Sequence, residues 1–113
     1  MSDFVHLRLH TEYSLVDSVV RIPRLIERVQ QLNMSAVALT DQSNVSAMVK
    51  FYCAAIERGV KPIVGADVWI AEDHTDSNPS RATFLCTELS GFRHLSQLLT
   101  RSYTEGQAHG RPL

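Results

Sequence analysis

Short apolar runs alternate with amphipathic segments along this chain, and the alternation limits the folds that it can adopt. Residues 35–41 (SAVALTD) form an apolar run that ends at Thr40 and Asp41, which is typical of a strand buried on both faces of a parallel sheet. Segments with the apolar spacing of amphipathic helices lie on both sides of this run. This order favours an α/β fold, in which right-handed crossovers make the sheet largely parallel.

Three helices and three further strands are predicted around this first strand. The predicted helices cover residues 21–33, 45–58 and 90–103, and the predicted strands cover residues 4–10, 61–73 and 82–88. Asn33 and Gly59 are expected to end the first two helices, and Ser43 or Asn44 to cap the second. Gly65 is expected to bend or loosen its strand. Residues 104–113 have no periodicity and are expected to form an unpatterned tail.

The helical spacing also predicts which side chains face the core. The expected inward positions are Ile22, Leu25, Ile26, Val29 and Leu32 in the first helix; Val45, Met48, Val49, Tyr52, Ala55 and Ile56 in the second; and Phe92, Leu95, Leu98 and Leu99 in the third.

The first predicted strand, residues 4–10 (FVHLRLH), carries an unusual polar face. Strand side chains alternate, so Val5, Leu7 and Leu9 would face the core while His6, Arg8 and His10 face the other way. Imidazoles at this spacing could gather around a metal ion, but arginine stays protonated and has no acceptor atom. The face therefore looks like a metal site with one ligand missing.

Other polar residues are predicted to join this face at one edge of the sheet. In parallel α/β folds the functional groups lie at the carboxyl ends of the strands. His10 ends the first strand, Asp41 and Gln42 end the second, and Asp67 lies within the third. We expect these four side chains to converge. Asp41 could be a catalytic carboxylate, but a structural role in an Asx-type turn is favoured.

Composition excludes some classes of function. The 113 residues are 44% hydrophobic, enough for the core of one domain or part of one. A formal net charge of −1 gives no basic field for nucleic-acid binding by this segment. No apolar run approaches the roughly 18 residues of a membrane span, and a cytoplasmic location is expected. Cys53 and Cys86 are interpreted as buried thiols in a reducing compartment, not as a disulfide or a metal site.

Three segments together resemble a known family. FVHLRLHTEYSLVD, AVALTDQSNVSAMVKFYCAA and GVKPIVGADVWIA are similar, in order and spacing, to the start of bacterial replicative DNA polymerase III alpha subunits, which is their polymerase and histidinol phosphatase (PHP) domain. The likeness covers residues 4–103. It implies that residues 1–103 are the N-terminal portion of a distorted, seven-stranded TIM-like β/α barrel with mostly parallel strands. Four predicted strands are too few for a barrel, so the chain is expected to be part of a larger protein.

The resemblance also implies a set of metal-ligand positions. In active members the strand ends hold zinc or manganese-like ions, and the ligand positions in this sequence are Arg8, His10, Asp17, Gln42, Asp67 and a position near Arg81. His10 and Asp17 match the family pattern, and Asp67 is a shortened equivalent of its usual glutamate. Arg8, Gln42 and Arg81 depart from it. Zinc needs about four imidazole, thiolate or carboxylate ligands, so we expect a vestigial site without metal. Further ligands would lie beyond Leu113.

Arg8 is expected to replace the charge of the lost metal ions. Buried carboxylates without a cation are costly, and a guanidinium can pair with a carboxylate through two hydrogen bonds. We therefore predict an ion pair between Arg8 and Asp17 or Asp67. The alternative is that Arg8 extends into solvent.

The remaining motifs have structural interpretations. His6, His74, His94 and His109 are interpreted as surface or structural histidines, and Phe51, Tyr52 and Trp69 as core or contact residues. Arg21, Arg24 and Arg28 recur at helical spacing, which usually indicates a solvated face. A contact of this face with DNA or another subunit is the less favoured interpretation.

The resemblance implies a part of a DNA-directed DNA polymerase. The polymerase carboxylates, their magnesium ions, and the contacts with DNA and deoxynucleoside triphosphates would lie in sequence outside this chain. The chain itself would be a scaffold without a cofactor that docks the proofreading exonuclease subunit and meets other replicase subunits. The alternatives are a metal-dependent PHP phosphoesterase or a 3′–5′ exonuclease, in which metal-bound hydroxide attacks a phosphate ester. Arg8 and Gln42 count against both.

Overall fold

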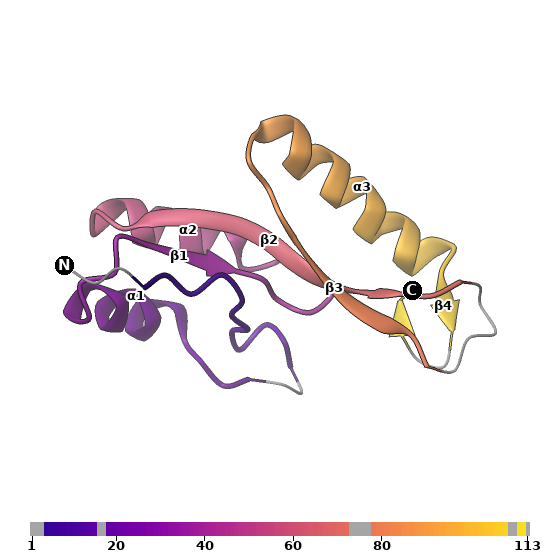
Figure 1. Cartoon of the computed structure of the whole chain (residues 1–113), viewed down its shortest axis with the longest axis horizontal. Helices are drawn as coiled ribbons and strands as arrows, with labels where there is room; N and C mark the ends of the chain where they lie inside the picture. Colours follow the sequence, from indigo (N-terminus) through magenta and orange to yellow (C-terminus); the bar gives the residue numbers. More distant parts are fainter. Residues whose placement is uncertain (1–3, 16–17, 73–77, 109–110, 113) are drawn as a thin grey trace.

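The structure, a computed structural model, describes residues 4–15, 18–72, 78–108 and 111–112. The elements are α1 (Ile22–Gln31), β1 (Ala36–Leu39), α2 (Met48–Glu57), β2 (Lys61–Ile70), β3 (Ser80–Leu85), α3 (Leu89–Thr104), β4 (Gln107–Ala108) and β5 (Arg111–Pro112). The molecule is elongated, with extents of 46 × 28 × 23 Å. In Figure 1, α1, β1 and α2 gather at one end, and α3 and β4 lie at the other. None of the helices in the described ranges is long and apolar enough to cross a bilayer.

β2 is the central strand, and it changes partner at its midpoint. Its first half pairs in parallel with β1, from Ala36 opposite Lys61 to Leu39 opposite Val64. Its second half pairs antiparallel with β3, from Gly65 opposite Leu85 to Ile70 opposite Ser80. The prediction of a largely parallel sheet therefore holds for β1 and β2 but is wrong for β3. The connection over residues 71–79 is shorter than the dozen or more residues that a parallel crossover needs.

Gly65 lies where β2 changes partner, and the structure gives the reason for a glycine there. A Cβ atom at this position would lie 2.2 Å from the backbone oxygen of Phe84 on β3. No side chain can occupy that space unless the two strands move apart. The predicted loosening at Gly65 is in fact a close approach of two backbones.

The larger hydrophobic core lies between α1, α2, β1 and the start of β2. Its buried members are Ile22, Leu25, Ile26, Val29, Met34, Val37, Leu39, Ala47, Phe51, Ala55 and Val60. Four of the five inward positions predicted for α1 are buried. The fifth, Leu32, is exposed because α1 ends at Gln31 and Leu32 is its C-cap.

The inward face of α2 differs from the prediction. Ala47, Phe51 and Ala55, spaced by four residues, face the core, and of these Ala55 was predicted to do so. The predicted Val49, Tyr52 and Ile56 are exposed by 65%, 48% and 56%. Both sets satisfy helical spacing, and the two small alanines let the helix backbone approach the sheet while Phe51 fills the space between them.

α1, which precedes β1, and α2, which precedes β2, end in the same way. Asn33 and Gly59 have positive φ angles of 57° and 70°. After α1, the Met34 N–H bonds the Val29 carbonyl, and after α2, the Val60 N–H bonds the Ala55 carbonyl. This is the Schellman arrangement, and it confirms the predicted helix ends. The predicted cap at Ser43 or Asn44 is wrong, because the N-cap of α2 is Ala47 and no side chain bonds it.

Residues 4–10 lie beside β1 without forming a regular strand. The carbonyls of His6 and Leu9 accept the N–H groups of Ala38 and Thr40, both at 2.9 Å. The two carbonyls are three residues apart in one segment, whereas the two N–H groups are two residues apart in β1. The N-terminal segment therefore has one extra residue, as in a β-bulge, and its side chains do not alternate strictly between the two faces. Leu7 is consequently exposed, contrary to the prediction, whereas Leu9 packs against the larger core.

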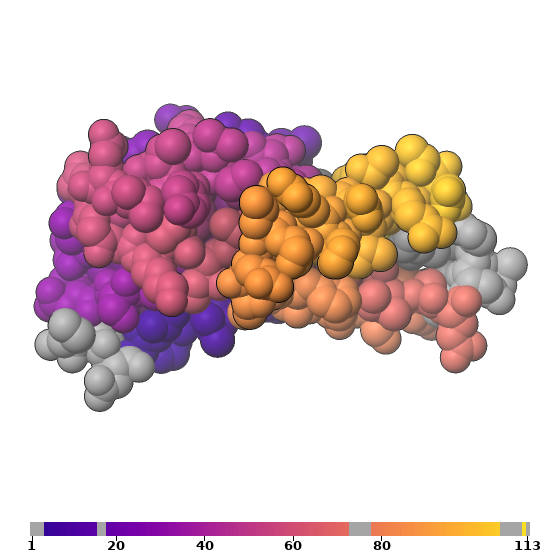
Figure 2. Space-filling model, turned by 90° about the horizontal axis from the view of Figure 1, so that it is seen from above, coloured from indigo at the N-terminus to yellow at the C-terminus, as the bar shows by residue number. Residues whose placement is uncertain are grey.

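The other end of the molecule has a much smaller core. Ala66, Leu95 and Leu99 are buried, with Val45, Val68 and Cys86 packed against them. The predicted inward residue Leu98 is exposed. In Figure 2, α3 and the residues that follow it form a narrower extension beside the broader N-terminal half. Residues 104–113, where no periodicity predicted an element, contain β4 and β5, which pair antiparallel with Gln107 opposite Pro112.

Both cysteines are free thiols. The prediction that both are buried is wrong for Cys53, which is exposed on α2. Cys86 is half-buried, and this burial raises the pKa of its thiol.

Candidate functional site

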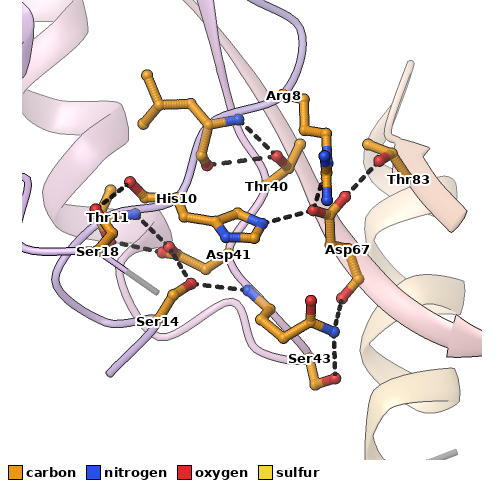
Figure 3. Close-up of polar contacts among 12 residues, drawn as sticks. Arg8, His10, Thr11, Ser14, Ser18, Thr40, Asp41, Ser43, Asp67 and Thr83 are labelled. Atoms are coloured by element: carbon orange, nitrogen blue, oxygen red, sulfur yellow. Dashed lines mark hydrogen bonds and ion pairs between the residues drawn. The ribbon is translucent and has the colours of Figure 1, made fainter. Parts of the chain in front are cut away.

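The candidate site lies where β1 ends and the chain passes beside the middle of β2. Gln42 and Asp67 form a parallel bridge, the Asp67 N–H bonds the Asp41 carbonyl at 3.1 Å, and the Ser43 N–H bonds the Asp67 carbonyl at 2.7 Å. The segment that ends at His10 reaches the same place (Figure 3). The convergence of His10, Asp41, Gln42 and Asp67 at one edge of the parallel pair is therefore confirmed.

Asp67 is the centre of the site. Its side chain is 0% exposed, and both carboxylate oxygens accept hydrogen bonds. Arg8 Nε donates to Oδ2 at 2.7 Å, and His10 Nε2 lies 2.5 Å from the same oxygen. The hydroxyl of Thr83 on β3 donates to Oδ1. The predicted ion pair of Arg8 with a carboxylate is thus confirmed, and it is made through Nε.

The surroundings of Asp67 keep its carboxylate ionised. Burial by itself raises the pKa of Asp67 because it removes the charged form from water. The hydrogen bonds from Thr83, His10 and Arg8, and the positive charge of Arg8, together outweigh burial and lower the pKa of Asp67 below its usual value. Stability from this group is therefore present at neutral pH and is lost in acid.

Asp41 organises the loop that follows His10. It is 1% exposed, and its carboxylate accepts the Thr11 N–H at 2.6 Å, the Thr11 hydroxyl at 2.8 Å and the Ser14 hydroxyl at 2.8 Å. These bonds favour the structural interpretation of Asp41 over the catalytic one. The Asx-type turn forms instead at Asn44, whose Oδ1 accepts the Ser46 N–H at 3.1 Å.

Of the other two departures from the family pattern, Gln42 contacts Asp67, whereas Arg81 contacts Trp69. Gln42 Nε2 donates to the Ser43 hydroxyl at 3.2 Å and to the Asp67 carbonyl at 3.3 Å, and within the described residues its buried Oε1 has no hydrogen-bond partner. Arg81 pairs in register with Trp69, and its guanidinium lies 4.4 Å from the Trp69 ring centroid. Thr83, two residues further along β3, is the residue that bonds Asp67.

The sequence analysis did not identify Thr83, Thr11, Ser14 or Thr40 as members of the site. Thr40 Oγ1 accepts the Leu9 N–H at 2.8 Å and so fixes the segment that carries Arg8 and His10. The only sequence feature that could have indicated these residues is weak: each has a hydroxyl group and lies near the end of a predicted strand. The position of Thr83 depends on the antiparallel register of β2 and β3, which no local pattern specifies.

Several predicted residues lie outside the site or outside the described ranges. Asp17, His74 and His109 are among the residues whose structure is not described. His6 is exposed, with its ring edge-on to Phe4 at 4.7 Å between centroids, and His94 is exposed on α3. Arg21, Arg24 and Arg28 are exposed, as predicted for a solvated face.

The described residues at the site, which do not include Asp17, do not fit a metal centre. In the part of the chain that the structure describes, no group of three or more His, Cys, Asp or Glu residues could hold a metal ion. His10 and Asp67 provide two donor groups, whereas zinc takes about four. The Arg8 guanidinium already pairs with the Asp67 carboxylate, and its positive charge would repel a cation there. The arrangement joins three chain segments by hydrogen bonds.

Sequence comparison finds one family model that matches most of the chain. The PHP domain model matches residues 6–113. A DNA polymerase III subunit alpha of Pseudomonas aeruginosa is 50% identical over 107 residues, and one of Escherichia coli K12 is 36% identical over 110 residues. The matches cover 95% and 97% of this chain but only 9% and 10% of the relatives. The chain therefore spans about a tenth of the length of these relatives.

Comparison with solved structures finds the same type of fold. A protein from Bifidobacterium adolescentis assigned as a metal-dependent phosphoesterase superimposes with a TM-score of 0.62 at 15% identity, over 87% of this chain and 32% of that protein. An amidohydrolase from Chromobacterium violaceum, solved with bound sulfate and no metal, gives a TM-score of 0.61 at 19% identity, over 88% of this chain and 36% of that protein. These likenesses support the TIM-like α/β fold.

Proposed function

The chain belongs to the PHP domain family, and from this premise we propose that it is the N-terminal part of the PHP domain of a replicative DNA polymerase. The identity of up to 50% with DNA polymerase III alpha subunits supports this assignment. In this proposal the parent protein carries out template-directed DNA synthesis. Its magnesium ions, DNA and deoxynucleoside triphosphates bind to sequence outside this chain.

Within that parent, we propose that this segment is a metal-free scaffold without hydrolytic activity. The observation that carries the proposal is the Arg8–Asp67 ion pair, at 2.7 Å with Asp67 fully buried. A guanidinium supplies one fixed positive charge and directional hydrogen bonds, but it is not a Lewis acid, so it cannot coordinate a water molecule and generate hydroxide as zinc or manganese would. The proposal is supported by the hydrogen bonds from Thr83, His10 and Arg8 and the charge of Arg8, which outweigh burial and lower the pKa of Asp67.

The scaffold role includes a docking role in this proposal. A domain that has lost its metal chemistry can be retained for the surfaces that it presents, and the proposed partner is the proofreading exonuclease subunit of the replicase. Co-elution of this chain with that subunit in size-exclusion chromatography is the expected result. Independent elution at micromolar concentrations of both proteins would contradict the docking role and leave the scaffold role unaffected.

Metal content and hydrolysis test the absence of activity. We would measure bound zinc and manganese in the purified chain and in a longer polypeptide that includes the rest of the PHP domain. Phosphodiester hydrolysis and 3′–5′ digestion of single-stranded DNA would be assayed on both. We expect no stoichiometric metal and no hydrolysis. Stoichiometric metal that is lost on His10→Ala, together with hydrolysis, would contradict the proposal and favour a phosphoesterase or exonuclease.

A further inference from the structure

We propose that a groove along α1 docks an acidic peptide segment that carries an aliphatic side chain and belongs to a partner protein. We define the α1 groove by its lining residues, which are Val19, Val20, Arg21, Arg24, Leu25 and Arg28, around a cavity of about 630 Å³. This inference rests on the proposed docking role, and it adds a surface and the chemistry of the partner. The groove is separate from the Asp67 site.

Three guanidinium groups give the α1 groove its charge. Arg21, Arg24 and Arg28 follow an i, i+3, i+7 spacing, so they lie on one face of α1. Their existing contacts are long: Arg21 Nε lies 3.6 Å from Glu12 Oε2, and an Arg28 Nη1 donates to the Gln31 side chain at 3.3 Å. All three side chains are exposed. They can therefore turn toward carboxylates, which a planar guanidinium can bind with two hydrogen bonds.

Apolar side chains between these arginines distinguish the groove from an ordinary charged helix face. Val19 is 90% exposed and Val20 is also exposed. Leu25 is buried beneath them and joins the larger core. Leu32, expected in the core, is exposed on the next turn after Arg28. Arginine is enriched at protein interfaces, and an aliphatic side chain of a partner could cover the exposed Val19 and Val20 and remove their apolar surface from water.

The charges around the groove favour a peptide over a nucleic acid. Glu12 lies beside Arg21, and Glu27 is exposed on α1 next to Arg28. The chain as a whole has a net charge of −1. Duplex DNA presents a phosphate about every 1.7 Å of its axis, so these carboxylates would repel part of any bound backbone. A peptide can place single carboxylates at the arginines and direct other residues away from Glu12 and Glu27.

Fluorescence anisotropy of a labelled peptide tests this inference on the full chain. The probe is a fluorescein-labelled peptide of repeated Asp-Glu-Leu units, and the comparison probe replaces each acid by its amide. We expect saturable binding of the acidic probe that weakens with added salt. The double variant R24E/R28E should weaken it by roughly tenfold or more. Circular dichroism and urea unfolding of the variant would verify its fold.

The single variant Arg28→Glu has a matched control in Arg58→Glu, which makes the same change of charge at an exposed arginine outside the groove. This control variant should bind the acidic probe like the unmodified chain. Val19→Ser, which keeps the charges, should weaken the binding of the acidic probe by roughly threefold. No saturable binding, an equal loss in Arg58→Glu, or tighter binding of a single-stranded oligonucleotide than of the acidic probe would overturn the inference. The metal and hydrolysis assays decide the proposed function separately.

Discussion

The two ends of this molecule are held together in different ways. The N-terminal half, formed by α1, β1, α2 and the first part of β2, has eleven buried hydrophobic residues in one cluster. The C-terminal half, formed by the second part of β2 with β3, α3, β4 and β5, has three among its described residues. β2 runs through both halves. The comparison indicates that side-chain burial stabilises the first half, whereas backbone pairing with an already fixed strand orders much of the second.

Asp67 lies at the junction between these two halves. It follows the point at which β2 changes partner, and it bonds Arg8 and His10 of the N-terminal segment as well as Thr83 of β3. Three of the ligand positions that the family resemblance implies, Arg8, His10 and Asp67, thus meet at the junction. In this chain a guanidinium and two hydrogen bonds connect the segments there.

The largest expected effect comes from the larger core. Phe51→Ala removes a fully buried ring and should lower the free energy of unfolding by about 3–5 kcal/mol. Leu95→Ala, in the smaller core, should lower it by about 2 kcal/mol because fewer buried neighbours lose contacts. Urea unfolding followed by circular dichroism measures both. Equal losses, or a larger loss for Leu95→Ala, would contradict the contrast between the two halves, and exposed Tyr52→Ala is the control.

Gly65→Ala should weaken the pairing of β2 with β3 and leave the N-terminal half intact. The new Cβ would lie 2.2 Å from the Phe84 oxygen, so β3 must move away, at a cost of about 1–3 kcal/mol. Amide hydrogen exchange should become faster in the β2–β3 pairing over residues 65–70, while protection of Val37 and Leu39 in β1 persists. A uniform loss of protection in β1 and β3 would mean that the halves unfold as one unit.

Asp67→Asn tests the junction itself. The amide cannot accept hydrogen bonds at both positions as the carboxylate does, and Arg8 loses its partner. We expect a loss of about 2 kcal/mol in the free energy of unfolding, with faster exchange of the Ala38 and Thr40 amides that hold the N-terminal segment. Glu57→Gln removes one negative charge from an exposed position at the end of α2 and should change stability by less than about 0.5 kcal/mol. Equal effects of the two variants would contradict a structural role of the Asp67 charge.

Acid should act on the same junction. Because the pKa of Asp67 is lowered in the folded chain, the unfolded chain takes up this proton first as the pH falls. The stability from Asp67 is therefore complete above the pKa of an unfolded aspartate, about 3.9, and is lost as the pH falls through the lower folded value. Urea midpoints measured between neutral and acidic pH should fall more steeply for the unmodified chain than for Asp67→Asn. Parallel profiles would exclude this linkage.

The smallest expected effect concerns the turn that leads into β2. Gly59 has a φ angle of 70°, and an added Cβ there would meet no atom within 4 Å. Gly59→Ala should therefore cost only the backbone strain of a left-handed alanine, about 1 kcal/mol. The urea midpoint measures this change. A loss as large as that of Gly65→Ala would mean that space, not backbone conformation, limits this position.

The sequence predicted the features of this fold that depend on local physics. Helix ends at Asn33 and Gly59 follow from the need for a left-handed residue, and the burial of Val37 and Leu39 follows from an uninterrupted apolar run. The inward face of α2 could not be predicted in this way. Val49, Tyr52 and Ile56 satisfy helical spacing as well as Ala47, Phe51 and Ala55 do, and the distance to the sheet decides between them.

The candidate site was predictable in part for a similar reason. His10, Gln42 and Asp67 could be brought together because parallel strands end at a common edge, and the Arg8 pair followed from the need to neutralise a buried carboxylate. Thr83 could not be placed, because its contact with Asp67 depends on the antiparallel register of a strand expected to be parallel. Because β3 pairs antiparallel with β2, and not in parallel as predicted, Thr83 lies beside Asp67.

The contact between Arg8 and Asp67 also has a consequence during synthesis of the chain. Their separation of 59 residues means that Arg8 leaves the ribosome roughly 3–12 s before its partner, at about 5–20 residues per second. β1, which pairs with this segment, is made about halfway through that interval, so residues 4–10 first lack both partners and then lack only Asp67. The segment that carries Arg8 can therefore form its ion pair only after the middle of β2 has been made.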